Sequence, residues 1–186
     1  ALDFWRGIDD ADWIEEVLSF VLDRLRGLLR EQGCRHDVCD AAFALGDDDL
    51  ARVARRVRAL EAFLATPEGG DLLTGYRRAV NILAAEARKG PLPEGEPTAA
   101  HDAPAQETAL IDAVAGARPA VDEALAREDF AAAMGALSIL RAPVDAFFDQ
   151  VLVNSPEPAE RANRLKLLSA VRALMGRVAD FSLVTG

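Results

Sequence analysis

The residues whose types and spacing come closest to a metal site are Cys34, His36 and Cys39, which fall within six consecutive positions. Thiolates and imidazoles are the ligands of structural zinc, but such a site usually needs a fourth ligand. The other histidine of the chain, His101, lies far away in a proline-rich stretch. A free thiol on a short apolar helix behaves as a small hydrophobic side chain. We therefore expect no metal site.

Asp145 and Asp149 form the second pair with possible chemistry, because they lie one helical turn apart. Two such carboxylates could bind Mg²⁺ or transfer protons. No other polar catalytic group accompanies them, and Arg141 four residues earlier completes a ladder typical of an ion-paired helix face. The sequence also has no glycine-rich phosphate loop, HExxH or GxSxG motif. We expect this chain to carry no catalytic residue and to bind no cofactor.

Arginines at helical spacing are the stronger polar signal. On a helical wheel, Arg77, Asn81 and Arg88 lie together beside the apolar stripe that begins at Leu72. Such a row of donors could contact phosphates or the edges of unstacked bases, whereas the alternative is a solvated charged face. Further candidates for such contacts are Arg78, Arg52, Arg55, Arg56, Arg161 and Arg172. Asp48 and Asp49 are close enough to neutralise one of the three arginines between residues 52 and 56.

Arg164 differs from the other arginines because it falls inside an apolar stripe with Leu168, Val171 and Met175. An unpaired buried charge is costly, so this position predicts a buried carboxylate partner rather than RNA.

These residues must be positioned by helices, since apolar residues recur at three- and four-residue steps and alternating strand patterns are absent. We predict an all-α bundle of about seven helices. The expected helices cover about 12–32, 36–45, 50–64, 70–88, 106–126 with a kink at Pro119, 130–151 with a continuation after Pro143, and 156–180. Four prolines between 89 and 105 predict one long loop.

Composition narrows the classes of protein. The chain has 186 residues, 51% of them hydrophobic, and no apolar run long enough for a membrane span, so we expect neither disorder nor a transmembrane helix. Two cysteines and no signal-peptide pattern favour the cytoplasm. Because the chain begins without methionine, we expect an excised fragment of a longer protein, the alternative being removal of the methionine by N-terminal processing.

Charge is distributed unevenly along the chain, whose net charge is -10. Residues 1–50 and 90–160 carry -8 and -10, whereas residues 51–89 and 161–186 carry +4 each. The acidic total therefore does not exclude RNA, but it limits RNA contacts to the two basic segments.

Five stretches of the sequence resemble the C-terminal region of the bacterial glycyl-tRNA synthetase β subunit. They are residues 29–37, 75–83, 140–153, 161–165 and 178–182. Together they cover about residues 23–183 in the same order, which makes the resemblance far more specific than any single motif.

The resemblance implies a DALR-type anticodon-binding helical domain over residues 23–186, preceded by a helical lead-in over residues 1–22. Such a domain holds tRNA(Gly) by its anticodon arm and positions it for a distant active site, which lies mainly on the α subunit. It also implies the α subunit and the rest of the β subunit as partners in an α2β2 tetramer, with ATP and Mg²⁺ used elsewhere. We expect neither DNA nor a membrane as a partner. The alternative is a structural module that packs against the rest of the synthetase without touching tRNA.

The resemblance also bears on single residues. It matches Cys34 and Cys39 to positions where the family commonly carries aliphatic residues. It matches Arg77, Arg78 and Asn81 to a family motif with a basic pair and an asparagine. Five further residues fall in family motifs as well: Asp145, Asp149, Arg161, Asn163 and Arg164. We expect Arg164 to pair with Asp145 or Asp149 and so to hold the last helix onto the preceding one.

Overall fold

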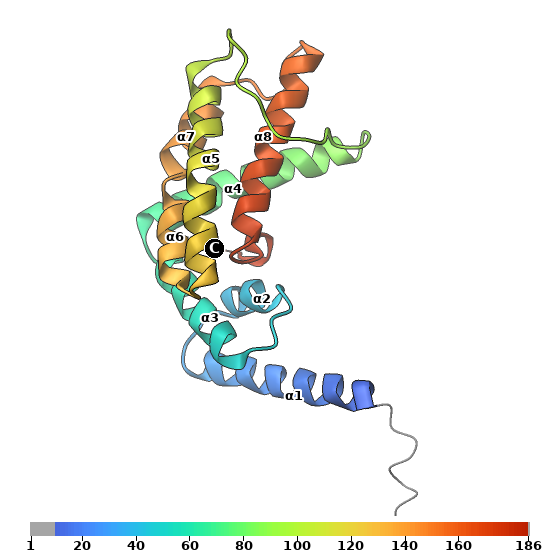
Figure 1. The fold of residues 1–186 in the computed structure, drawn as a ribbon, viewed down its shortest axis with the longest axis vertical. Coiled ribbons are helices and arrows are strands. Elements are labelled where there is room, and N and C mark those ends of the chain that lie inside the picture. Colours follow the sequence, from blue (N-terminus) through green and yellow to red (C-terminus); the bar gives the residue numbers. More distant parts are fainter. Residues whose placement is uncertain (1–9, 186) are drawn as a thin grey trace, which may run out of the picture.

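The computed structural model describes residues 10–185, and this part of the chain contains helices and loops without a strand (Figure 1). The predicted all-α fold is thus confirmed. The elements are α1 (Asp10–Glu31), α2 (His36–Phe43), α3 (Leu50–Leu64), α4 (Pro67–Ala87), α5 (Ala105–Ala126), α6 (Phe130–Ser138), α7 (Arg141–Gln150), α8 (Pro158–Gly176) and the short 3₁₀ helix η2 (Phe181–Leu183).

Helix starts follow the residue types at each boundary. Asp49 caps α3 by accepting a hydrogen bond from the Arg52 N–H, and Thr66 caps α4 in the same way with Gly69. The stretch predicted as one helix with a continuation after Pro143 consists of α6 and α7, which are separated at Ile139 and Leu140. A proline ring clashes with the carbonyl four residues earlier, here that of Ile139, which accounts for the position of the break.

The ends of the two long helices α5 and α8 were also predicted from prolines and apolar periodicity. The helix α5 continues past Pro119 to Ala126. The last helix, α8, ends at Gly176 rather than near Asp180, because Asp180 instead caps η2 by accepting from the Ser182 N–H.

The central element is α4, which packs against α3, α7, α8 and η2. In Figure 1, α5 stands beside α6 and α7 on one side and α8 lies on the other, with α4 crossing between these groups. Large side chains from all of these helices are fully buried, including Leu72, Leu83, Leu110, Phe147 and Leu168. One face of α4 therefore lies in the core and the opposite face is left for solvent.

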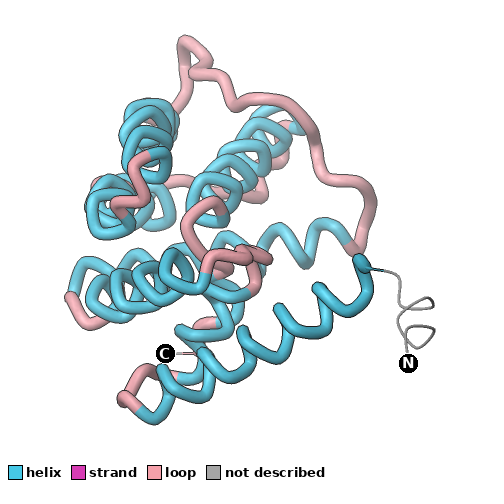
Figure 2. The backbone as a smooth tube through the Cα atoms, turned by 60° about the horizontal axis from the view of Figure 1, so that its bottom comes forward, coloured by secondary structure: helices cyan, strands magenta, loops and turns pink. Residues whose placement is uncertain are grey.

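The long proline-rich loop predicted at 89–105 connects α4 to α5 and arches over the outside of the bundle (Figure 2). Asn163 of α8 ties it down, since its side-chain amide accepts from the Thr98 N–H and donates to the Thr98 carbonyl, both at 2.9 Å.

Among the described residues, one helical stretch, Phe130–Gln150, is long and apolar enough to span a membrane by length and composition alone. This is weak evidence, because α6 and α7 contribute side chains such as Met134 and Phe147 to the core of the bundle.

The first helix, α1, is attached to the body mainly by its last turns. Leu29 is buried and Leu25 packs beside it. The other end of α1 extends away from the bundle in Figure 1, and Trp13, Ile14 and Phe20 are exposed there.

Candidate nucleic-acid interface

The solvent-facing side of α4 carries cations and small residues. Leu72, Tyr76 and Leu83 face the core. The exposed strip, which we call the α4 strip, consists of Thr74, Arg78, Asn81, Ala84, Ala85 and Arg88. No carboxylate lies on this strip, which makes it the most suitable described surface of α4 for a phosphate backbone.

The one acidic residue between Leu72 and Lys89 is Glu86, and it is turned inward with only 7% of its surface exposed. It pairs with Lys89 at 2.8 Å and with Arg161 of α8. The hydrogen bond from Lys89 holds the pKa of Glu86 below its ordinary value, so this carboxylate stays charged and occupied. Arg161, a candidate RNA contact, is thereby used inside the fold.

Arg77 was predicted to belong to the exposed donor row, but the structure gives it an intramolecular partner. It is half-buried, and its guanidinium donates to the backbone carbonyl of Val184 at 2.6 Å. The tail after η2 thus lies against this arginine. The predicted row is therefore reduced to Asn81 and Arg88, joined by Arg78 from the neighbouring row.

Arg78 lies over a ring rather than beside a carboxylate. Its guanidinium carbon is 4.5 Å from the ring centre of Phe148 on α7, a cation–π arrangement. It forms no ion pair with any described residue, so its charge and donors remain available. Sequence reasoning did not find Phe148, because the contact depends on how α4 and α7 pack.

The candidate contacts Arg52, Arg55 and Arg56, three of the four arginines of α3, are engaged elsewhere. Arg52 forms two hydrogen bonds with Asp47, at 2.6 and 2.7 Å, and Arg55 pairs with Glu128. Arg56 is buried, lies 3.1 Å from Asp47 and stacks over Phe130 at 4.7 Å. These contacts join α3 to the connection between α5 and α6, so all three candidate RNA contacts of this arc are paired within the fold. The neutralising carboxylates are mainly Asp47 and Glu128, rather than Asp48 and Asp49.

Arg172 on α8 is exposed and forms no ion pair within the described part of the chain. It therefore stays a candidate contact together with Arg78, Asn81 and Arg88.

Arg164 is buried with a carboxylate partner, as its place in the apolar stripe predicted, but the partner differs. Its guanidinium lies 2.8 Å from Glu107, 3.0 Å from Glu160 and 3.0 Å from the Leu152 carbonyl. Glu107 is also buried and accepts a second hydrogen bond from Asn163 at 2.7 Å. The start of α5 packs against α8, and this brings Glu107 to Arg164.

The predicted partners of Arg164 lie elsewhere. Asp145 is 3.8 Å from Arg141, which in turn pairs with Asp71 at 2.6 Å. Asp149 is exposed at the end of α7. The expected pairing of Arg164 with Asp145 or Asp149 is therefore wrong, because α5 rather than α7 supplies the carboxylate.

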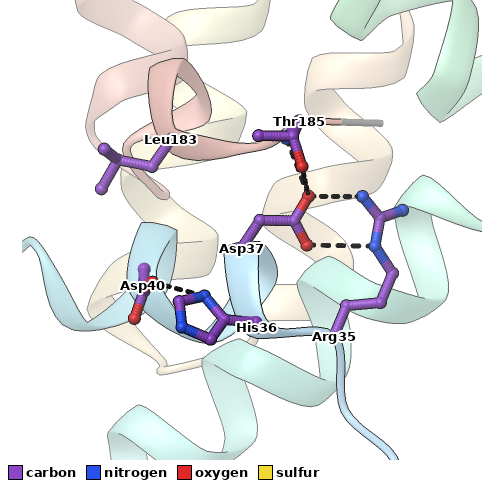
Figure 3. A pocket seen from close by; sticks show the side chains of 6 residues that line it. All are labelled: Arg35, His36, Asp37, Asp40, Leu183 and Thr185. Atoms are coloured by element: carbon purple, nitrogen blue, oxygen red, sulfur yellow. Dashed lines mark hydrogen bonds and ion pairs between the residues drawn. The ribbon is translucent and has the colours of Figure 1, made fainter.

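The segment that contains Cys34, His36 and Cys39 contacts the last described residues of the chain. Asp37 accepts from the Arg35 guanidinium at 2.6 and 3.1 Å and from the N–H and hydroxyl of Thr185 at 2.7 and 2.8 Å, beside a cavity of about 450 Å³ (Figure 3). Burial alone would raise the pKa of Asp37, but these hydrogen bonds outweigh it and hold the pKa well below the ordinary value. His36 pairs with Asp40 at 2.8 Å.

Neither cysteine of this segment takes part in a metal-like cluster. Cys39 is buried, and burial together with a hydrogen bond to Glu61 raises the pKa of Cys34 to about 11. Within residues 10–185, no group of three or more His, Cys, Asp or Glu side chains is arranged to hold a metal ion.

Comparison with known proteins identifies the family to which the chain is similar. The model of the DALR anticodon binding domain matches residues 72–180, a range that begins on α4 and contains the α4 strip. A glycine–tRNA ligase beta subunit from Phenylobacterium zucineum (strain HLK1) is 63% identical over 172 residues, covering 92% of this chain and 26% of that protein. Another from Ruegeria sp. (strain TM1040) is 48% identical over 185 residues, covering 98% of the chain and 26% of the relative.

The chain thus spans about a quarter of the length of these relatives and is homologous to that region of the ligase beta subunit. The proposed domain boundary at residue 23 lies outside the matched range and stays a prediction. The match covers more than half of the sequence, so the chain belongs to the DALR anticodon-binding domain family.

Proposed function

We propose that this chain is the tRNA-binding domain of a glycine–tRNA ligase beta subunit. It holds the anticodon arm of tRNA(Gly) so that the acceptor end reaches an active site elsewhere in the enzyme. Holding a substrate in the reactive geometry accelerates a reaction without any contact to the reacting atoms. ATP and Mg²⁺ are used at that distant site, and a synthetase of this kind works in the cytoplasm.

The observation that carries this proposal is the sign of the exposed charges on α4. In a chain of net charge -10, the α4 strip presents Arg78, Asn81 and Arg88 with no accessible carboxylate between Leu72 and Lys89. RNA binding depends largely on phosphate neutralisation, so contacts must concentrate where acidic side chains are absent.

The test is a binding titration of the chain with tRNA(Gly) and a non-cognate tRNA at several salt concentrations. We expect Arg88→Glu to weaken binding of tRNA(Gly) and to reduce the steepness of its salt dependence by about one ion per lost phosphate contact. Its matched control is Arg127→Glu, since Arg127 is an exposed arginine at the end of α5 that pairs with Glu123. Both changes alter the net charge equally.

Equal effects of the two substitutions would show that only net charge matters and would remove α4 as the contact surface. No binding of tRNA(Gly) by the unaltered chain would contradict the proposal as a whole.

A second candidate function is a structural module that packs against the remainder of the synthetase. The observation that favours it is the apolar surface of α1, where Trp13, Ile14, Val17 and Phe20 are exposed. Contiguous exposed apolar surface of this kind usually marks a protein contact. Because α1 and the α4 strip are on different elements, this role does not compete with RNA for surface. It would stand alone if the tRNA titration showed no binding.

A further inference from the structure

A shallow cavity of about 430 Å³ lies between α4 and the segment that connects α7 to α8. Its volume is in the range of small-ligand sites. Its lining includes Arg78 and Ile82 of α4, Phe148 and Asp149 of α7, and apolar residues of the connecting segment such as Val151 and Leu152. Apolar walls and a few polar groups at the rim are the usual composition of a site for a flat, partly polar molecule.

Beside the cavity, α4 and α7 approach closely one turn earlier. A Cβ atom on Gly75 would lie only 2.5 Å from Val144 Cγ1, so glycine is needed at this contact. Arg78 and Phe148 follow these two residues by about one helical turn, and the same close approach places the guanidinium over the ring. The Phe148 ring thereby covers one side of the guanidinium.

An arginine held in this way offers its outer face for stacking. Unstacked RNA bases stack on aromatic rings and on guanidinium planes and are then read by hydrogen bonds to their edges. Arg78 is exposed and forms no ion pair with a described residue, so no carboxylate covers its plane.

The charges of the cavity favour a base over a phosphate. Arg78 and Asp149 both line it, so its net charge is close to zero and a phosphate gains little there. The carboxylate of Asp149 is an acceptor that suits an exocyclic amino group such as N4 of cytosine, whereas uracil presents a carbonyl at that position.

We propose, resting on the tRNA-binding function above, that this cavity binds one unstacked nucleobase bearing an exocyclic amino group. The base stacks on the outer face of Arg78, and Asp149 accepts a hydrogen bond from the amino group. Asn81 and Arg88, which belong to the α4 strip but lie outside the cavity, then contact the backbone beside that base.

Homopolymers of equal length distinguish the contribution of the base to affinity from that of the backbone, because oligocytidylate and oligouridylate carry the same phosphates. We expect the unaltered chain to bind fluorescently labelled oligocytidylate more tightly than oligouridylate. Arg78→Lys keeps the charge but removes the planar stacking surface, and it should weaken oligocytidylate binding about tenfold without changing the salt dependence. The matched control is Arg127→Lys, a change of the same kind at an exposed arginine outside both the cavity and the α4 strip, which should leave the affinity within about twofold.

Asp149→Asn tests the acceptor. It should reduce the preference for oligocytidylate over oligouridylate, whatever its effect on overall affinity, because an amide both donates and accepts. Far-ultraviolet circular dichroism of each variant checks that these exposed substitutions leave the helices intact.

Three outcomes would overturn the inference: equal binding of the two homopolymers, equal effects of Arg78→Lys and Arg127→Lys, or an unchanged preference in Asp149→Asn. If tRNA(Gly) still binds and Arg88→Glu weakens it, only the base site is wrong. If the unaltered chain binds neither tRNA(Gly) nor either homopolymer, the proposed function fails together with it.

Discussion

At the scale of single residues, burial divides the arginines into those that hold the fold and those left for a partner. Arg56 and Arg164 are buried, and each is paired with a carboxylate that is itself mostly covered. Arg78 and Arg88 are exposed and have no carboxylate partner among the described residues. An arginine therefore stabilises the fold where it is buried beside a carboxylate, and it is available to a partner where it is exposed without one.

The pair of Arg164 and Glu107 leads to a prediction about stability. In Arg164→Met, the buried Glu107 keeps only Asn163 as a partner, and leaving one buried charge uncompensated costs about 3–5 kcal/mol in the free energy of unfolding. Urea unfolding measures this loss. The control is Arg127→Met, whose exposed pair with Glu123 is worth about 0.3–0.5 kcal/mol. Similar losses of unfolding free energy in the two variants would show that the buried pair stabilises the fold no more than the exposed pair does.

The burial of Arg164 could be predicted from its helical wheel, but its partner could not. Glu107 is 57 positions away, and its approach depends on how α5 packs against α8. For the same reason the sequence pointed to Arg77 as exposed, although Val184 near the end of the chain occupies it. The base-stacking pair of Arg78 and Phe148 has no signal in the local pattern either, since it joins two helices.

At the scale of elements, α3 is attached to the bundle by charge as well as by apolar packing. Its apolar face buries Val53, Val57 and Leu60. Its polar edge meets Asp47 and Glu128, which lie in the connections before α3 and after α5. Helix positions followed from apolar periodicity and from caps such as Asp49, because both are local. Which charged edge meets which loop depends on tertiary packing.

Asp47 makes this attachment dependent on pH. Hydrogen bonds from Arg52 are the main cause that lowers its pKa from 3.8 to about 2, so the ionised form is the one that stabilises the fold. Its contribution is complete above the unfolded value of 3.8 and is lost as the pH falls from there to about 2. Asp47→Asn should therefore be less stable at neutral pH, by about 3 kcal/mol, and should lose less further stability over that acidic range.

The midpoint of urea unfolding across this pH range checks the prediction. Asp48→Asn serves as the control, because Asp48 is largely exposed and lies 3.7 Å from Arg52. If Asp48→Asn and Asp47→Asn gave parallel pH profiles, Asp47 would not be the group that links α3 to acid stability.

At the scale of the whole molecule, the last described residues pack against α2, the second helix. Thr185 donates to Asp37 at the start of α2, and the Asp180 N–H donates to the Ala41 carbonyl on the same helix. Residues 36–185 thus form one closed body whose last residues cover its second helix. The first part of α1 lies outside this closure, with Trp13, Val17 and Phe20 exposed.

This arrangement predicts what removal of the lead-in does. A chain lacking residues 1–22 keeps Leu25 and Leu29, the side chains through which α1 packs on the core. Its free energy of unfolding should therefore change much less than in Leu29→Ala, for which deleting a fully buried leucine side chain costs about 2–5 kcal/mol. Urea unfolding of both variants beside the unaltered chain makes the comparison. A truncation as costly as Leu29→Ala would place all of α1 within the folded domain and would move the domain boundary from residue 23 toward the start of the helix.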